Sequence, residues 1–221
     1  TLNQPGKDLM RKLPATDWKL PAYSTMRSSH GKLENKKNIL THSGQTAIHT
    51  SHFLDTKAEN FTAIRVTIHP DNDDPKKFPF KGSVLSQLIA QKITPDGKAH
   101  DIPLSYVFAN DPIGFYDPQH TLRPNNQGIG GYPKLHKKRE AIIITKAPVT
   151  FKPGEHLRLT LHQKASVTGN QPAHLRHYQL HFSNSPAWHQ LLNAPAHKQN
   201  LAAYNQAQKN YTAIKGTKIP I

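Results

Sequence analysis

The fold class follows from the stretch Phe61-Thr-Ala-Ile-Arg-Val-Thr-Ile-His-Pro-Asp71. Apolar side chains occupy every second position from Ile64 to Ile68, and polar side chains fill the positions between them. Because successive side chains of a strand point to opposite faces, this pattern predicts a β-strand with one buried side. Pro70 and the acidic cluster that follows it are expected to end the strand.

Further segments extend this pattern along the chain. Residues 157–161 and 177–182 each alternate apolar with polar side chains, which predicts two more half-buried strands. Residues 104–108 and 141–145 are apolar on both faces, so we expect buried strands there, the first of them central in its sheet. Thr94-Pro-Asp-Gly97 has the composition of a tight turn between two strands.

The chain divides into three parts by its pattern. Residues 1–16 read as a polar linker, and residues 17–183 carry the short strands. Residues 184–221 change to a helical pattern, with a short helix that Pro195 ends and a second helix over 197–214 that has one apolar stripe. We expect this helical extension to lead into a further domain downstream.

Short strands separated by Pro-, Gly- and Asn-rich loops favour two packed antiparallel sheets over a βαβ arrangement. We therefore predict a mainly β fold: an antiparallel β-sandwich of the jelly-roll type found in galactose-binding modules, with a short helical C-terminal extension. Residues 84–93 are ambiguous, because their apolar positions fit a strand and a helical stripe equally well.

Several motifs resemble one region of a known family. They are the 61–71 strand, Gly82-Ser-Val-Leu-Ser-Gln-Leu88, Asp17-Trp18-Lys-Leu20, Asn38-Ile-Leu-Thr-His-Ser-Gly44, Gly154-Glu-His-Leu-Arg-Leu-Thr-Leu161 and Leu175-Arg-His-Tyr-Gln-Leu180. Together they resemble the β-sandwich region between the two signature domains of the planctomycete and verrucomicrobial cytochrome-associated surface proteins, the planctomycete cytochrome C domain-containing family. The chain departs from that family's pattern at Gly130-Gly131-Tyr132 and at 175–178.

The resemblance covers roughly residues 17–221. It implies a strand rather than a helix over 84–93. It also implies a periplasmic, extracellular or cell-surface location and flanking domains within a longer chain.

The charge balance favours anionic partners. The 221 residues contain 29 Lys and Arg against 14 Asp and Glu, a net charge of +15 with histidine neutral, and 15 histidines besides. The summed field of such a chain attracts polyanions. Alternatively, the charge only keeps the protein soluble or complements an acidic neighbouring domain. The absence of cysteine excludes a disulfide scaffold, a thiolate zinc site and a Cys nucleophile. No apolar run approaches the roughly 20 residues that cross a bilayer.

Neither a catalytic centre nor a firm metal site emerges from the residue pattern. Hydrolysis needs paired carboxylates, or a nucleophile with a histidine base, and no such set can be assembled, so we predict a protein that is not an enzyme and has no cofactor. One dense acidic group offers oxygen ligands for a structural calcium ion, or is only a solvated loop: Asp71, Asp73 and Asp74. The pairs His49/His52 and His177/His181 lack a defensible metal-ligand spacing.

The segment 110–139 is the best candidate for a binding surface, because loops of this length are usually functional or disordered. Aromatic rings stack on sugars, and cationic donors bind sulfate or carboxylate groups. The candidate ligand-binding residues are Phe115, Tyr116, Arg123, Asn125, Tyr132, Lys134, Lys137, Lys138 and Arg139. Alternatively, Phe115 and Tyr116 only cap the end of the sandwich, and residues 137–139 form a solvated edge.

These observations lead to two functional hypotheses. The first is a non-catalytic carbohydrate-binding-like module that favours anionic or sulfated polysaccharide. The second is a structural spacer that positions the flanking domains, with the C-terminal helices as the interface. Nucleic acid is expected to bind only nonspecifically, because no recognised nucleic-acid-binding signature is present.

Overall fold

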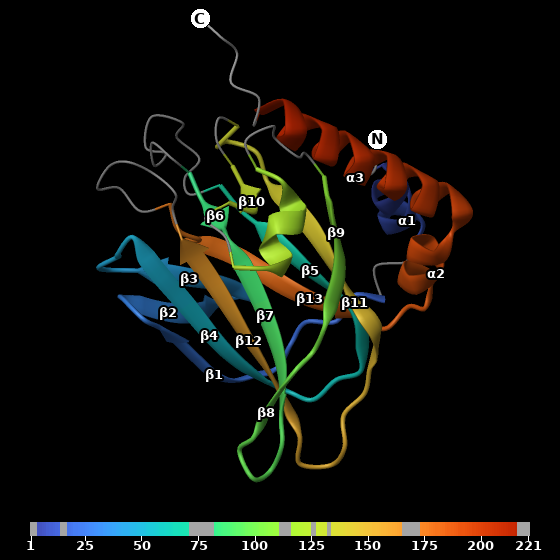
Figure 1. Ribbon diagram of the computed structural model, residues 1–221. Coiled ribbons are helices and arrows are strands. Elements are labelled where there is room, and N and C mark those ends of the chain that lie inside the picture. Colours follow the sequence, from blue (N-terminus) through green and yellow to red (C-terminus); the bar gives the residue numbers. More distant parts are fainter. Residues whose placement is uncertain are drawn as a thin grey trace, which may run out of the picture.

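A computed structural model describes residues 4–13, 17–70, 82–110, 116–124, 127–131, 134–164 and 173–215, with side chains omitted at 208 and 211–215. Two large antiparallel sheets face each other and form a β-sandwich (Figure 1). The five-stranded sheet has the order β1 (Tyr23–Ser28), β4 (His49–Lys57), β12 (His156–Lys164), β7 (Gln87–Ile93) and β8 (Ala99–Asp101). The six-stranded sheet has the order β2 (Lys32–Lys36), β3 (Ile39–Ser43), β13 (His177–Ser183), β5 (Phe61–Ile68), β11 (Arg139–Val149) and β9 (Leu104–Ala109).

The alternating positions form the interior of the sandwich, as the sequence predicts. Ile64, Val66 and Ile68 of β5 are buried with Leu157, Leu159 and Leu161 of β12 in one apolar cluster between the sheets. Tyr178, Leu180 and Phe182 of β13 belong to the same cluster. A mainly β sandwich with C-terminal helices is therefore the fold of this chain.

Three helices lie outside the sandwich, against the six-stranded sheet (Figure 1), and a second apolar cluster fills the space between them and the outer face of that sheet. The helices are α1 (Gln4–Lys12), α2 (Ala187–Asn193) and α3 (Pro195–Lys215). Trp188 of α2 is fully buried there, and its ring lies 5.6 Å from that of Trp18 between centroids. Tyr106 and Phe108 of β9 complete this layer with Ile142 and Ile144 of β11.

This layer explains two differences from the sequence predictions. Residues 1–16 were expected to be a polar linker, but α1 lies within them and Leu9, Met10 and Leu13 pack against the second cluster. The strand over 104–108 was expected to be central, but β9 is the last strand of its sheet. Its two apolar faces arise because one faces the interior and the other lies under the helices.

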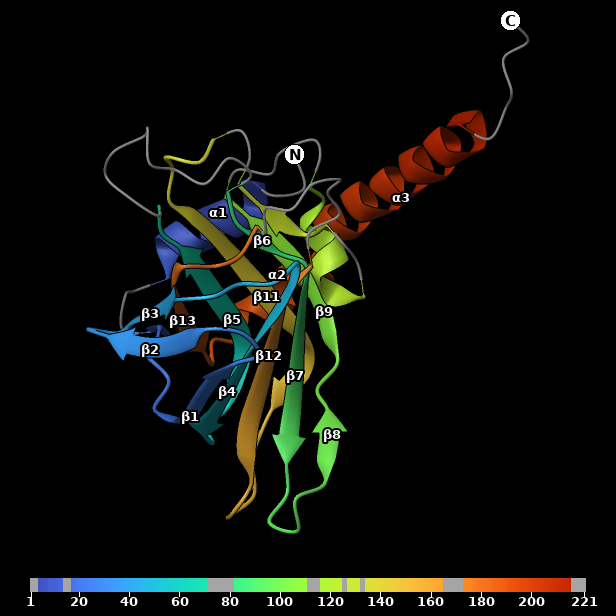
Figure 2. The same ribbon diagram turned by 90° about the vertical axis from the view of Figure 1, so that its left-hand side faces the viewer.

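Helices α2 and α3 follow one another with a break at Ala194, and Pro195 begins α3 rather than only ending the preceding helix. Figure 2 shows that α3 extends away from the sandwich. Near its start, Leu201 packs against the second cluster, and the Tyr204 hydroxyl donates a hydrogen bond of 2.5 Å to the Asp117 carboxylate. Farther along, the described side chains at 205–207 and 209–210 are exposed.

Short elements connect the two sheets at one end of the sandwich. The ambiguous segment 84–93 forms two strands, β6 (Val84–Leu85) and β7, as the resemblance implied. Segment 110–139, expected to be a long loop, contains the 3₁₀ helix η3 (Pro118–Leu122) and β10 (Ile129–Gly130), which pairs with β6. At the opposite end, the predicted turn 94–97 joins β7 to β8, with Gly97 at φ 81°.

Candidate functional site

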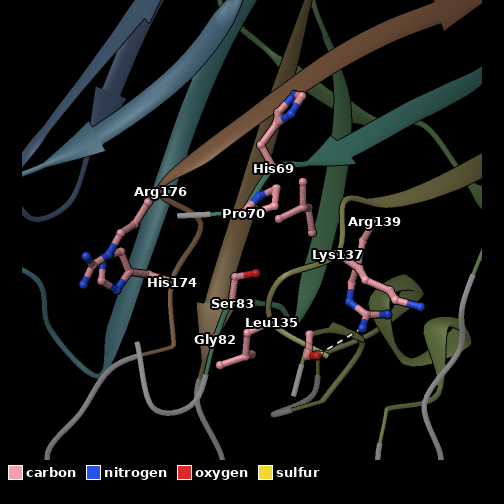
Figure 3. Close-up of a pocket in the computed structure, with 11 residues that line it drawn as sticks. His69, Pro70, Gly82, Ser83, Leu135, Lys137, Arg139, His174 and Arg176 are labelled. Carbon is pink, nitrogen blue, oxygen red and sulfur yellow. Dashed lines mark hydrogen bonds between the residues drawn. The ribbon is translucent and has the colours of Figure 1, made fainter. Parts of the chain in front are cut away.

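A cationic pocket opens at the end of the six-stranded sheet. Figure 3 shows His174 and Arg176 together on one side and Lys137 and Arg139 together on the other. The full set of lining residues is Ile68, His69, Pro70, Gly82, Ser83, Gly131, Leu135, Lys137, Arg139, His174 and Arg176. Five of the described lining residues are basic and none of them is acidic.

Strand pairing brings these residues together from distant parts of the chain. The last residue of β5, Ile68, lies opposite both Arg139, the first residue of β11, and Tyr178 at the start of β13. Antiparallel pairing thus places the end of one strand beside the beginnings of its two neighbours. The backbone N–H of His69 donates to the carbonyl of His177, which fixes the junction at 2.9 Å.

Arg139 gives the pocket a rigid wall. Its side chain is buried and its guanidinium donates hydrogen bonds of 3.1 Å to the Gly131 carbonyl and 3.2 Å to the Lys134 carbonyl. These bonds hold the loop before β11 in place, and Lys137 is carried by that loop. On the other side, Arg176 Nε donates to His174 Nε2 at 3.2 Å, which orients both side chains.

Lys137 is the most available cation of the pocket. It is exposed, and within the described part of the chain its ammonium group has no ion-pair partner. An ammonium on a flexible stem binds anions as a point charge, whereas Arg176 offers a planar set of donors suited to sulfate, phosphate or carboxylate oxygens. These side chains are therefore chemically suited to hydrogen bonding with an anionic group.

The pocket is small, with a volume of about 30 Å³. A single water needs about 10–15 Å³ of such space, so the pocket has room for a compact charged group but not for a sugar ring. A much larger groove of about 620 Å³ opens nearby, at the same end of the five-stranded sheet. Its size falls in the range of ordinary small-molecule sites.

This groove is lined by residues of β4, β7 and β12, by Ser86 just before β7 and by Pro124 after η3, and all of them except Pro124 are polar. They are His49, Thr50, Ser51, Ser86, Gln87, Pro124, His162, Gln163 and Lys164. His162 Nδ1 and the Ser51 hydroxyl lie 2.8 Å apart, which holds the imidazole in the groove wall. The Ser86 hydroxyl donates to the His162 carbonyl at 2.9 Å and accepts from the Lys164 N–H at 2.9 Å, which ties β12 to the segment between β6 and β7.

Behind the pocket, three histidines and a tyrosine form a buried stack between the sheets. The His42 ring centroid lies 5.3 Å from that of His174 and 4.9 Å from that of His52. His52 Nδ1 and the Tyr178 hydroxyl are 2.8 Å apart. Burial lowers the pKa of His52 to about 3, with smaller contributions from the charges of His42 and His174.

The structure distributes the predicted ligand-binding residues over several places. Lys137 and Arg139 line the pocket, and Lys134 contributes the carbonyl that Arg139 binds. Lys138 instead pairs with Glu140 at 3.3 Å, and Arg123 is exposed just after η3, outside the lining of the pocket and of the groove. Three predicted residues, Phe115, Asn125 and Tyr132, lie outside the described residues.

Tyr116 has a packing role. Its ring lies so close to Gly130 that a Cβ on that glycine would come within 2.5 Å of the ring. This position is outside the lining of both the pocket and the groove. The part of Tyr116 in ligand binding stays a prediction.

Three basic residues of the pocket were not predicted from the sequence: His69, His174 and Arg176. His69 follows the first strand recognised, and Arg176 precedes another, so both were visible as strand-flanking cations. What was missing was the knowledge that β5 and β13 are neighbours, which alternation within each strand does not reveal.

The metal predictions have separate outcomes. Asp71, Asp73 and Asp74 lie outside the described residues. Within the described ranges, no group of three or more His, Asp or Glu side chains is arranged to hold a metal ion. His49 and His52 occupy opposite faces of β4, one exposed and one buried, as their spacing predicts. His162 lies in the other sheet from His177 and His181.

Comparisons with known proteins give one structural similarity. No protein-family model matches the chain, and no curated protein matches it. Among solved structures, it is similar to the carbohydrate-binding module CBM32-3 from a family 31 glycoside hydrolase of Clostridium perfringens, with 12% identity and a TM-score of 0.34 over 78% of this chain and 94% of that one. Among the described residues, no helix is long and apolar enough to span a membrane. The β-sandwich assignment rests on the strand order of the chain itself.

Proposed function

We propose that this protein is a non-catalytic module that binds anionic polysaccharide, with the cationic pocket as the site for a sulfate or carboxylate substituent. The observation that carries the proposal is the convergence of Lys137, Arg139, His174, Arg176 and His69 on one small pocket whose described lining contains no acidic side chain. Charge-assisted hydrogen bonds from such donors are about twice as strong as neutral ones.

Two features support the binding of an anion at this pocket. First, two of the basic side chains are held by hydrogen bonds, Arg139 to two carbonyls and Arg176 to His174, so they are preorganised for an anion. Second, the rest of the chain is also basic, with a net charge of +15, which attracts polyanions from solution. The first feature provides a defined site, and the second speeds the association of the protein with a polyanion.

Affinity electrophoresis in native gels tests the proposal. Gels that contain carrageenan or fucoidan should retard the protein, and gels with a neutral glucan should not. Lys137→Gln should weaken the affinity, obtained from the retardation, by at least about tenfold, because it removes one charge-assisted contact worth roughly 1.5–3 kcal/mol. Lys98→Gln is the matched control, since it removes the same charge from an exposed position at the opposite end of the sandwich, where Lys98 pairs only with Asp96.

The outcomes are distinct. Equal mobility in all gels would contradict the proposal. Equal weakening by both substitutions, together with loss of retardation in moderate salt, would reduce the interaction to nonspecific electrostatics and contradict a defined site.

A structural spacer is the second candidate, and one observation favours it. Helix α3 extends away from the sandwich (Figure 2). The described side chains at 205–207 and 209–210 are exposed. In this proposal α3 contacts a flanking domain of a larger cell-surface or periplasmic protein, in line with the family resemblance. Expression of the chain with its natural neighbouring sequence, followed by hydrogen exchange along 205–215, tests it: protection there only in the longer protein supports a spacer, and unchanged exchange contradicts it.

A further inference from the structure

The cationic pocket and the polar groove share a wall. Gln163 lines the groove, and its side-chain oxygen accepts a 2.5 Å hydrogen bond from the backbone N–H of Leu175. Leu175 lies between His174 and Arg176, which both line the pocket. A single side chain of the groove thus holds the segment that presents two basic residues to the pocket.

A second connection runs through the segment before β7. Ser83 lines the pocket and Ser86 lines the groove, and three residues of extended chain span at most about 10 Å. The carbonyl of Ser83 accepts from the Gly131 N–H at 3.1 Å, and the Ser86 N–H donates to the His162 carbonyl at 2.9 Å. Both cavities are therefore anchored to the same short stretch of chain at one end of the sandwich.

The difference in size assigns different parts of a ligand to the two cavities. The pocket, at about 30 Å³, has room for a charged substituent, whereas the groove, at about 620 Å³, has room for several sugar rings. Gln87, Ser51 and His162 offer hydrogen-bonding groups of the kind that sugar hydroxyls require, and Pro124 adds apolar surface. Lys164 adds a positive charge at the groove.

Resting on the function proposed above, we propose that the groove is a second subsite of the same binding site, which holds the sugar rings of an acidic polysaccharide whose charged substituent occupies the pocket. The ligand then runs across the end of the sandwich, from the pocket past residues 83–87 into the groove. It follows that the protein recognises an internal stretch of polysaccharide and that affinity increases with chain length.

Calorimetric titration with sulfated carrageenan oligosaccharides of defined length tests this inference. The disaccharide, tetrasaccharide and hexasaccharide are compared for the wild-type protein and for Gln87→Ala, which changes no charge. From disaccharide to hexasaccharide the wild type should gain at least about tenfold in affinity, and Gln87→Ala should lose about fivefold for the hexasaccharide, the effect of one hydrogen bond. Its disaccharide affinity should equal that of the wild type.

Two further variants separate this inference from the proposed function. Lys137→Gln, in the pocket, should weaken all three oligosaccharides, whereas Lys98→Gln should weaken none beyond a small, salt-sensitive effect. Binding that does not depend on chain length, or a Gln87→Ala variant that matches the wild type at every length, overturns the groove subsite and leaves the pocket standing. Absence of binding at all lengths, with the fold intact by circular dichroism, overturns the proposed function and the subsite together.

Discussion

Acid should destabilise this protein through a specific buried group, His52. Its side chain is fully buried between the sheets, and the groups that face it are His42 from β3, His174 and the Tyr178 hydroxyl. Its Nε2 atom has no hydrogen-bond partner among the described residues. Burial disfavours the charged imidazolium and lowers the pKa of His52 to about 3, so the native protein keeps this ring neutral where an exposed histidine would take up a proton.

The direction and size of the effect follow from proton linkage. Below pH 6.5 the unfolded chain binds a proton at His52 and the native state does not, so the free energy of unfolding falls as the pH is lowered. The slope is about 1.4 kcal/mol per pH unit and persists until the pH nears the folded pKa of about 3. Between pH 7 and pH 5, His52 alone should therefore remove about 2 kcal/mol.

Urea unfolding, followed by the fluorescence of the buried Trp188, measures this loss at pH 7, 6 and 5. The informative variant is His52→Gln, which cannot titrate and retains a hydrogen-bonding group for the Tyr178 hydroxyl. His181, whose pKa burial lowers to about 4, also destabilises the native state in acid, but its effect is common to both proteins and cancels in the difference. The wild type should lose about 2 kcal/mol more than the variant, or about 4–8 °C in Tm.

The control is His49→Gln, on the same strand but exposed, which should follow the wild type. Equal acid sensitivity of the wild type and His52→Gln would refute the reasoning. It would mean that the imidazolium is accepted inside the sandwich, through solvent entry or rearrangement of the stack, and that burial does not set the protonation of His52.

Two further predictions concern packing. Gly130→Ala should lower the free energy of unfolding by about 1–3 kcal/mol, because its Cβ would come within 2.5 Å of the Tyr116 ring. Gly131→Ala should leave it nearly unchanged, since the nearest atom to its Cβ would be 3.6 Å away. Thermal unfolding of the two variants provides the comparison. Trp188→Ala should lower the free energy of unfolding by about 3–5 kcal/mol, because Trp188 is fully buried in the second apolar cluster. Leu20→Ala, at an exposed position, should lower it little. Similar small losses for both variants in denaturant unfolding would contradict the role of this cluster as a core.

Alternation of apolar and polar residues was sufficient to place most of the sandwich. It located β5, β12 and β13 because each has one face in the interior, and this signal is local in the sequence. It could not locate α1, because a short segment with Pro5 and Gly6 has a weak helical signal on its own. Gly6 is buried there, and a Cβ at that position would come within 2.3 Å of the Phe108 ring, so α1 is stabilised by close packing on β9.

The candidate site was predictable only in part, for a related reason. The basic run that contains Lys137 and Arg139 is contiguous, so it was visible as a cluster of charge. Its partners His69, His174 and Arg176 lie far away in the sequence, and they meet it only because β5 pairs with β11 on one side and β13 on the other. Strand order depends on long-range pairing, which no local pattern encodes.

The two outer faces of the sandwich carry different side chains, and this difference bears on where ligands bind. Helices cover the outer face of the six-stranded sheet (Figures 1 and 2). Without them, the apolar side chains on that face would be exposed to water. The outer face of the five-stranded sheet instead carries paired charged groups. Arg158 donates to both Asp55 carboxylate oxygens at 2.7 and 2.9 Å, and the Arg27 guanidinium lies 4.2 Å from the Phe53 ring centroid in a cation–π contact. Pairs of this kind leave a sheet face stable in water without a covering layer. The groove lies at the end of this face, next to the cationic pocket, where the acidic polysaccharide proposed above would reach both.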